Sequence, residues 1–455
     1  MTLPNSAAAR DVRFILHPVT DARRNEETGP IVIERGEGIY VIDDAGNRYI
    51  EGMAGLWNVA VGFGEKRLVD AATKQLSTLP YYHTFSQKSN LPSIDLAEKL
   101  VQISPERLQH VFFTNSGSEA NDSVVKMVWY YNNAIGRPKK KKFLARHKGY
   151  HGITVASGSL TGLPGNHRDF DLPAIPVHHL TCPHHYRFAE PGESEEAFSE
   201  RLAAELEAYI EAEGADTIAA FIGEPILGAG GVMPPPAGYW AKIKAICRRH
   251  DILIVADEVI TGFGRVGTMF ASDYYGIDPD ILVVSKQITS AYQPLAAVLI
   301  SDALYQGIAD NSNKLKSFAH GFTTTGNPVA CAVGLENLAI IEERDLVANA
   351  KRMGALMHAK LAPFCDHPLV GEIRGVGLIA GIELVADKAS KAAFEPVGKV
   401  GADFFHRAHA HGLIVRGIGD TIALCPPLII TEVEVEDMIV RFSRTLDDVA
   451  KSVNA

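Results

Sequence analysis

The sequence of 455 residues predicts an α/β fold, with a large domain that contains a mainly parallel sheet and a smaller α+β domain built from both termini. From about residue 93 onward, short and almost continuously apolar runs alternate with helical segments, which is typical of parallel strands buried on both faces. Residues 30–52 instead contain brief β-type runs separated by turn residues, as antiparallel strands do. A chain of this length has enough material for both domains.

Six apolar runs are the candidate strands of the large domain. They occupy residues 110–115, 142–147, 218–225, 252–259, 281–286 and 295–301. A covering helix is predicted at 195–213, because its apolar residues repeat on one stripe and Gly214 follows as a helix-ending residue. The predicted boundaries are 1–62 for the N-terminal part of the smaller domain, 63–329 for the large domain and 330–455 for the C-terminal part of the smaller domain.

Charge and composition exclude several classes of protein. The formal net charge of −10 argues against a nucleic-acid-binding protein, since such proteins cluster Lys and Arg on the binding surface. No run of eighteen apolar residues occurs and the first residues contain no apolar leader, so we expect neither membrane insertion nor export. The five cysteines are scattered and odd in number, which favours reduced thiols and a cytoplasmic location.

Polar residues follow several of the candidate strands, at the edge where open parallel sheets bind ligands. The stretch 114–118, TNSGS, passes from a strand into a helix and offers backbone N–H groups and hydroxyls to an anion such as phosphate. A simple helix cap made by Ser116 or Ser118 explains the same residues equally well. Both interpretations stay open on these residues alone.

Asp257 and Lys286 end two successive apolar runs. A buried carboxylate needs a cationic or N–H partner, so a structural salt bridge between these two residues is one interpretation. In the other, Asp257 holds a protonated ring nitrogen, and Lys286 forms a Schiff base once burial and neighbouring charge lower its pKa. Together with a phosphate site, these are the groups that pyridoxal 5′-phosphate requires.

Several motifs follow one another in the order found in a known family. They are TNSGSEAND, KGYHG, GEPILGAGG, ADEVITGFGR, SKQITSAY and HGFTTTGNP, between GLWN near residue 55 and CPPLII near residue 425. On these motifs the chain resembles the class III pyridoxal-phosphate-dependent aminotransferases of fold type I, and within them the ω-transaminase, or amine:pyruvate, branch. The resemblance implies a sheet of the seven-stranded type, pyridoxal 5′-phosphate as cofactor, and a homodimer with shared active sites, whose further assembly into a tetramer stays open.

The resemblance assigns nine residues to the cofactor. Lys286 would hold it covalently and then move a proton between substrate and cofactor, while Tyr150 would stack on its ring. Thr323 would reach the phosphate from the neighbouring subunit. The full set is Ser116, Gly117, Ser118, Tyr150, Glu224, Asp257, Val259, Lys286 and Thr323.

Six residues are implied for the substrate pocket. A small apolar and aromatic wall suits an amine that has no carboxylate and limits the size of its side group. Arg416 would bind the carboxylate of pyruvate or alanine, because a guanidinium matches a carboxylate with two parallel hydrogen bonds. A core position for Trp57 and a surface ion pair for Arg416 are the alternatives. The set is Leu56, Trp57, Phe85, Tyr150, Ala229 and Arg416.

The main hypothesis is a ping-pong transaminase that moves an amino group from an amine or ω-amino acid to a 2-oxo acid such as pyruvate. A decarboxylase or epimerase of the same fold, or a non-catalytic protein that binds the cofactor, stays open. Ile260 stands where related enzymes for ornithine or 4-aminobutyrate carry glutamine, which favours pyruvate as the amino acceptor. Gln287 lies beside the lysine, and the sequence alone predicts no consequence of its bulk. The His- and Cys-rich stretch 178–186 suggests zinc, but its ligands do not come from two separated segments, so we expect no metal.

Overall fold

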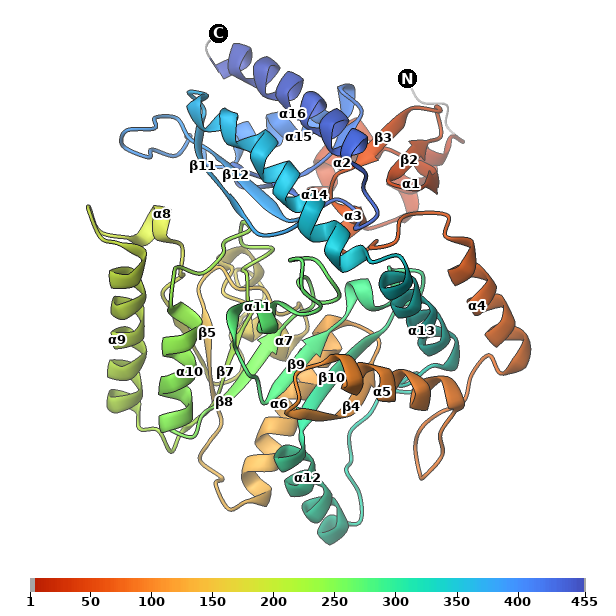
Figure 1. The fold of residues 1–455 in the computed structure, drawn as a ribbon, viewed down its shortest axis with the longest axis vertical. Helices are drawn as coiled ribbons and strands as arrows, with labels where there is room; N and C mark the ends of the chain where they lie inside the picture. The colour runs from red at the N-terminus through yellow and green to blue at the C-terminus, as the bar shows by residue number, and fades with distance from the viewer. Residues whose placement is uncertain (1–4, 454–455) are drawn as a thin grey trace.

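The structure is a computed structural model that describes residues 5–453, and its large domain is built around a seven-stranded sheet. The strands are β4 (Leu108–Thr114), β5 (Lys142–Arg146), β6 (Val177–Leu180), β7 (Ile218–Gly223), β8 (Leu253–Asp257), β9 (Ile281–Val284) and β10 (Ala296–Ser301). Their order is β4-β10-β9-β8-β7-β5-β6. Strand β10 pairs antiparallel with both neighbours and the other pairs are parallel, which confirms the predicted fold class (Figure 1).

Each predicted apolar run coincides with one of these strands, although β4 begins two residues before its run and several strands end before the run does. Strand β9 ends at Val284, so Lys286 lies beyond the strand and not at its last position as expected. Strand β6 was not predicted, because its four residues include His178 and His179 and it lies at the sheet edge, where the apolar signal of a buried strand is weak. The predicted helix at 195–213 is confirmed by α9 (Glu195–Glu213).

Helices cover both faces of the large sheet. Besides α9, they are α5 (Leu91–Ile103), α6 (Gly117–Ala134), α7 (Val155–Leu160), α10 (Tyr239–Arg249), α12 (Asp302–Leu315) and α13 (Pro328–Glu343). Alternate residues of β9 face opposite cores, since Leu282 packs in the cluster of α5, α9, α10 and α13, whereas Val283 packs in that of α6, α7 and α12. Burial on both faces explains why the strands read as continuous apolar runs.

The smaller domain combines segments from both ends of the chain. Its strands are β1 (Ile33–Glu37), β2 (Tyr40–Asp43), β3 (Arg48–Glu51), β11 (Val370–Gly375), β12 (Ala380–Leu384), β13 (Leu413–Ile414), β14 (Arg416–Ile418) and β15 (Thr421–Leu424). They form two sheets, β1-β2-β3-β13 and β11-β12-β15-β14. Strand β3 pairs in parallel with β13, where Ile50 lies opposite Leu413.

Three long helices complete the smaller domain, and Figure 1 shows them in blue near the red and orange N-terminal strands. They are α14 (Leu346–Leu361), α15 (Lys399–Ala410) and α16 (Glu432–Val453). The predicted boundary between residues 329 and 330 lies inside α13, and the exact domain boundaries stay a prediction.

The remaining helices of the described residues belong to connecting segments and to the N-terminal region. They are α1 (Ala7–Phe14), α2 (Ala22–Thr28), α3 (Ala54–Trp57), α4 (Lys66–Thr78), α8 (His185–Phe188) and α11 (Ala271–Tyr275), with the 3₁₀ turns η1 (Pro164–Asn166), η2 (Lys286–Thr289) and η3 (Ala362–Asp366). Over residues 5–453, no helix has the combination of length and apolar character that crossing a membrane needs.

Candidate active site

A cavity of about 350 Å³ lies at the carboxyl ends of β7, β8 and β9, beside the N-terminus of α6. Open α/β sheets bind their ligands at this edge. Eight of the nine residues expected at the cofactor line the cavity, and the exposed Thr323 is the exception. The eight are Ser116, Gly117, Ser118, Tyr150, Glu224, Asp257, Val259 and Lys286.

One wall of the cavity is the first turn of α6. The Ser116 hydroxyl accepts a hydrogen bond from the N–H of Glu119 at 3.2 Å, so Ser116 caps the helix. The first N–H groups of a helix have no partner within it, and the helix dipole adds positive potential there. A Cβ atom at Gly117 would lie 3.2 Å from Cγ2 of Val259, so a larger residue would crowd this wall. The structure therefore shows the helix cap, and the anion site at the same turn stays a prediction.

The carboxylate of Asp257 is buried, with 3% of the residue exposed, and it is held from two sides. Its Oδ2 atom lies 2.8 Å from Nδ1 of His151 and accepts a hydrogen bond from Nδ2 of Asn121, also at 2.8 Å. The expected alternative, a salt bridge to Lys286, does not form among the described residues, because His151 is the partner instead. Our sequence reasoning missed both partners, although Asn121 ends TNSGSEAN and His151 lies in KGYHG.

Lys286 begins η2, just after β9, with a φ of +46°. A lysine in this left-handed region is strained, and such strain is found mainly at functional sites. Burial lowers the pKa of its ammonium group, against the opposing influence of Asp257 and Glu224. The amine is therefore more easily deprotonated than an exposed lysine.

Gln287 points away from the cavity into a buried hydrogen-bond network. Its amide nitrogen donates to the carbonyls of Ile260 at 2.9 Å and Gly262 at 2.8 Å. Its oxygen accepts from Nη2 of the buried Arg265 at 3.2 Å. The bulk of Gln287 therefore anchors the lysine turn to the segment after β8, a consequence that its position in the sequence did not reveal.

Glu224 connects the cavity floor to two neighbouring loops. Its Oε1 atom accepts from the N–H of Tyr150 and its Oε2 atom from the N–H of Gly228, both at 2.9 Å. Burial raises the pKa of the Glu224 carboxyl. Glu224 therefore fixes the backbone that carries Tyr150.

The residues expected at the substrate, apart from Tyr150, do not line this cavity in the described part of the chain. Trp57 is 2% exposed and packs in an apolar cluster, as its core alternative predicted, whereas Leu56 is 54% exposed. Phe85 lies along a second cavity of about 1190 Å³ at the surface. Arg416 is half-buried on β14 and near enough to Lys286 to influence its pKa.

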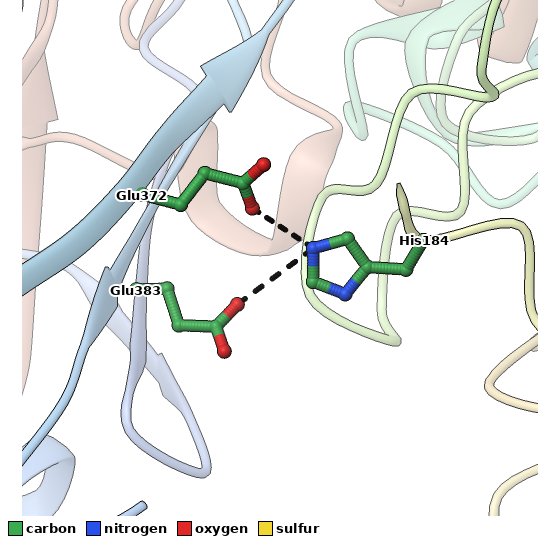
Figure 2. A group of neighbouring side chains, drawn as sticks. All are labelled: His184, Glu372 and Glu383. Carbon is green, nitrogen blue, oxygen red and sulfur yellow. Dashed lines mark hydrogen bonds and ion pairs between the residues drawn. The ribbon is translucent and has the colours of Figure 1, made fainter. Parts of the chain in front are cut away.

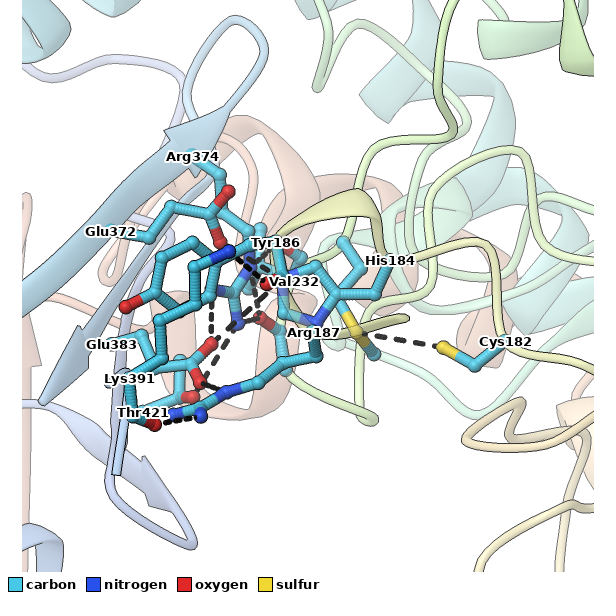
Figure 3. A network of polar contacts seen from close by, with 12 residues as sticks. Cys182, His184, Tyr186, Arg187, Val232, Glu372, Arg374, Glu383, Lys391 and Thr421 are labelled. Atoms are coloured by element: carbon cyan, nitrogen blue, oxygen red, sulfur yellow. Dashed lines mark hydrogen bonds and ion pairs between the residues drawn. The ribbon is translucent and has the colours of Figure 1, made fainter. Parts of the chain in front are cut away.

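A separate group with metal-ligand chemistry lies between the domains. Nε2 of His184 is 2.8 Å from Oε2 of Glu372 and 3.9 Å from Oε2 of Glu383 (Figure 2). However, Nη1 of Arg374 lies 2.7 Å from Glu372 and 2.6 Å from Glu383 (Figure 3). Because the guanidinium groups of Arg374 and Arg187 already pair with the two carboxylates, we interpret this group as an ion-pair cluster.

Comparison with known proteins gives a consistent result. The sequence model of the family described as aminotransferase class-III matches residues 22–446. The omega transaminase from Pseudomonas jessenii, solved in complex with PMP, is 59% identical with a TM-score of 0.98 and coverage of 99% for both chains. A thermostable omega transaminase variant engineered for asymmetric synthesis of enantiopure bulky amines is also 59% identical, with a TM-score of 0.98, covering 98% of this chain and 100% of its own. Gamma aminobutyrate transaminase 1, mitochondrial, from Solanum lycopersicum is 50% identical over 440 residues, which are 96% of this chain and 85% of that protein.

Proposed function

The chain belongs to the class III aminotransferase family, and from this premise we propose that it moves an amino group from an amine or ω-amino acid to pyruvate. The family and the pyridoxal 5′-phosphate cofactor expected from the motifs are confirmed. The reaction would run as two half-reactions on one site, with the first product leaving before the acceptor binds. The observation that carries the proposal is the placement of Lys286, Asp257 and the first turn of α6 around one cavity.

The residues of the cavity fit this cofactor. The first turn of α6 suits a phosphate, and the Asp257 carboxylate suits a protonated ring nitrogen, because His151 and Asn121 already hold it in place. Bound pyridoxal phosphate supplies an aldehyde and a ring that withdraws electrons from the bond being broken. The residues proposed to hold it are the eight that line the cavity, with Thr323 of a second subunit.

Lys286 is the proposed catalytic residue. Its lowered pKa makes the neutral amine available both as a nucleophile and as a base that takes a proton from the substrate carbon. Its position at the turn after β9 is held by Gln287 through the carbonyls of Ile260 and Gly262. The buried backbone therefore fixes the position of Lys286, so that the proton has a short distance to move.

The donor is proposed to be a carboxylate-free amine, and an ω-amino acid is the second candidate. Ile260 lines the cavity and offers no polar group to a second carboxylate, which supports the first. The curated relatives are named as gamma-aminobutyrate transaminases, which supports the second. The relatives reported above are all named as transaminases, so a decarboxylase or epimerase is not favoured.

We also propose a homodimer with shared active sites, in the cytoplasm. Phe85 is 44% exposed and Thr323 lies at the surface, outside the cavity of their own chain, which supports roles in the site of a second subunit. The five cysteines are free, which supports a reducing compartment.

The test follows the visible absorption of the bound cofactor. Addition of 1-phenylethylamine without acceptor should bleach the band, and pyruvate should restore it. The Lys286→Ala variant should lose turnover and the wild-type band, whereas Lys139→Ala, a substitution of a lysine whose side chain is 77% exposed, should behave as wild type. A band that responds to γ-aminobutyrate and not to the amine would move the assignment to the second candidate, and full turnover in Lys286→Ala would refute the proposed role of this lysine.

A further inference from the structure

The turn at 228–232, which follows β7, lies against the cofactor cavity and is packed tightly. The N–H of Gly228 donates to Oε2 of Glu224 at 2.9 Å, and a Cβ atom at Gly228 would lie 2.5 Å from Cδ1 of Ile260. Both Glu224 and Ile260 line the cavity. Because the turn also carries Ala229, its position affects the shape of the space beside the cofactor.

This turn contains an unusual backbone conformation. Val232 has a φ of +52°, and Gly231 before it has a φ of +135°. A β-branched residue in the left-handed region is strained, and it keeps that conformation only where its surroundings hold it. The Val232 side chain is fully buried in the apolar cluster that also contains Trp57. The turn therefore connects two of the residues proposed as walls of the substrate pocket.

Arg374, from strand β11 of the smaller domain, holds this strained turn. Its Nε atom donates to the carbonyl of Val232 at 2.9 Å, and its Nη2 atom donates to the carbonyl of Gly231 at 2.7 Å. Its Nη1 atom lies between Glu372 and Glu383 (Figure 3). The carboxylates fix one edge of the guanidinium, so the other edge presents two donors in a fixed direction.

We propose that Arg374 is a positioning residue that sets the size limit of the substrate pocket through the turn at 228–232. The inference rests on the proposed function and on the resemblance, which implies Ala229 and Trp57 as walls of the substrate pocket. Without the hydrogen bonds from Arg374 to the turn, Val232 can relax to an unstrained φ, and Ala229 and Trp57 lose their fixed separation. Lys286 and Asp257 are not in contact with Arg374 through any described hydrogen bond, so the chemical step is retained.

The test compares 1-phenylethylamine with 1-phenylpropylamine, which has one more methylene. A fitted apolar pocket discriminates one methylene by about tenfold or more in kcat/KM. In Arg374→Lys, the preference for the smaller amine should fall about tenfold, while kcat for that amine stays within about threefold of wild type. Amide hydrogen exchange at 228–232 should become faster in the same variant, because the turn loses donors that fix it.

Arg187→Lys is the matched control. Arg187 contacts Glu383 and the carbonyl of Lys391 in the same cluster but makes no contact with the turn among the described hydrogen bonds. It should change neither the amine preference nor the exchange at 228–232. An unchanged preference in Arg374→Lys, or an equal change in both variants, would overturn the inference.

A substitute variant and a measurement of wild-type activity complete the test. If Arg374→Lys does not fold, Glu372→Gln/Arg374→Gln removes the contact to the turn while conserving the net charge of the cluster, and the same outcomes apply. Wild-type turnover of 1-phenylethylamine with pyruvate is measured first. Its absence refutes the proposed function, whereas its presence with an unchanged preference in the Arg374 variant refutes only the role of Arg374.

Discussion

The free energy of unfolding of the wild type should fall as the pH rises from 5 to 7, and replacement of Glu51 by glutamine should abolish the part of this fall that Glu51 causes. Glu51 ends strand β3 and is buried, and its Oε1 atom accepts a hydrogen bond from the N–H of Met53 at 3.0 Å. Burial raises the pKa of its carboxyl from 4.5 to about 8. Glutamine has nearly the same shape and keeps the accepting oxygen, so the variant changes the charge and little else.

The size of the effect follows from proton linkage. Between about pH 4.5 and pH 8 the folded protein keeps a proton that the unfolded chain releases, so rising pH favours unfolding. At pH 7 the solution is about 2.5 pH units above the ordinary pKa, and each unit corresponds to about 1.4 kcal/mol. The buried carboxyl therefore lowers the free energy of unfolding by about 3 kcal/mol at pH 7, and by less than about 1 kcal/mol at pH 5.

Urea unfolding of the two proteins, each saturated with cofactor, measures this difference at pH 5, 6 and 7. Glu51→Gln should be more stable than wild type by an amount that grows with pH to about 3 kcal/mol. Glu34→Gln, an exposed substitution in the same sheet, is the control and should show no such growth. A constant difference between wild type and Glu51→Gln, or a variant that is less stable at pH 7, would refute the assignment of a neutral buried carboxyl.

Three further predictions concern the site. Gln287→Met removes three buried hydrogen bonds and should lower the free energy of unfolding, measured in urea, by about 3 kcal/mol. The control Gln306→Met, at an exposed position, should lower it by less than about 0.5 kcal/mol, and equal losses in the two variants would contradict the network. Arg416→Leu should lower kcat/KM for L-alanine by about 10- to 100-fold and leave 1-phenylethylamine within about threefold, so an equal fall for both would argue against carboxylate binding. Asp257→Asn should slow both donors about a hundredfold in kcat, and unchanged rates would show that its charge is not used.

The sequence was informative where a signal is local. The buried strands of the large sheet are runs of apolar residues, and the polar residues at or just beyond their ends, such as Asp257 and Lys286, lie at one edge because parallel strands share their direction. The short edge strand β6 lacks this signal, since two of its four residues are histidines.

The missing part of the site depends on distant contacts. His151 and Asn121 reach Asp257 from positions far from it in the chain, and no local pattern pairs them. The strained φ of Val232 and its bonds to Arg374 likewise depend on how the two domains meet. Phe85 lies along a second cavity at the surface, and its proposed place in the site of a second subunit depends on contacts between chains.

The pairing of β3 with β13 has a consequence for biosynthesis. Ile50 leaves the ribosome long before its partner Leu413 is made, a delay on the order of tens of seconds at ordinary rates of translation. During that time the edge of β3 is an open template for other strands. We therefore expect nascent chains that stop before residue 413 to aggregate or to need a chaperone, even when their large domain has already folded.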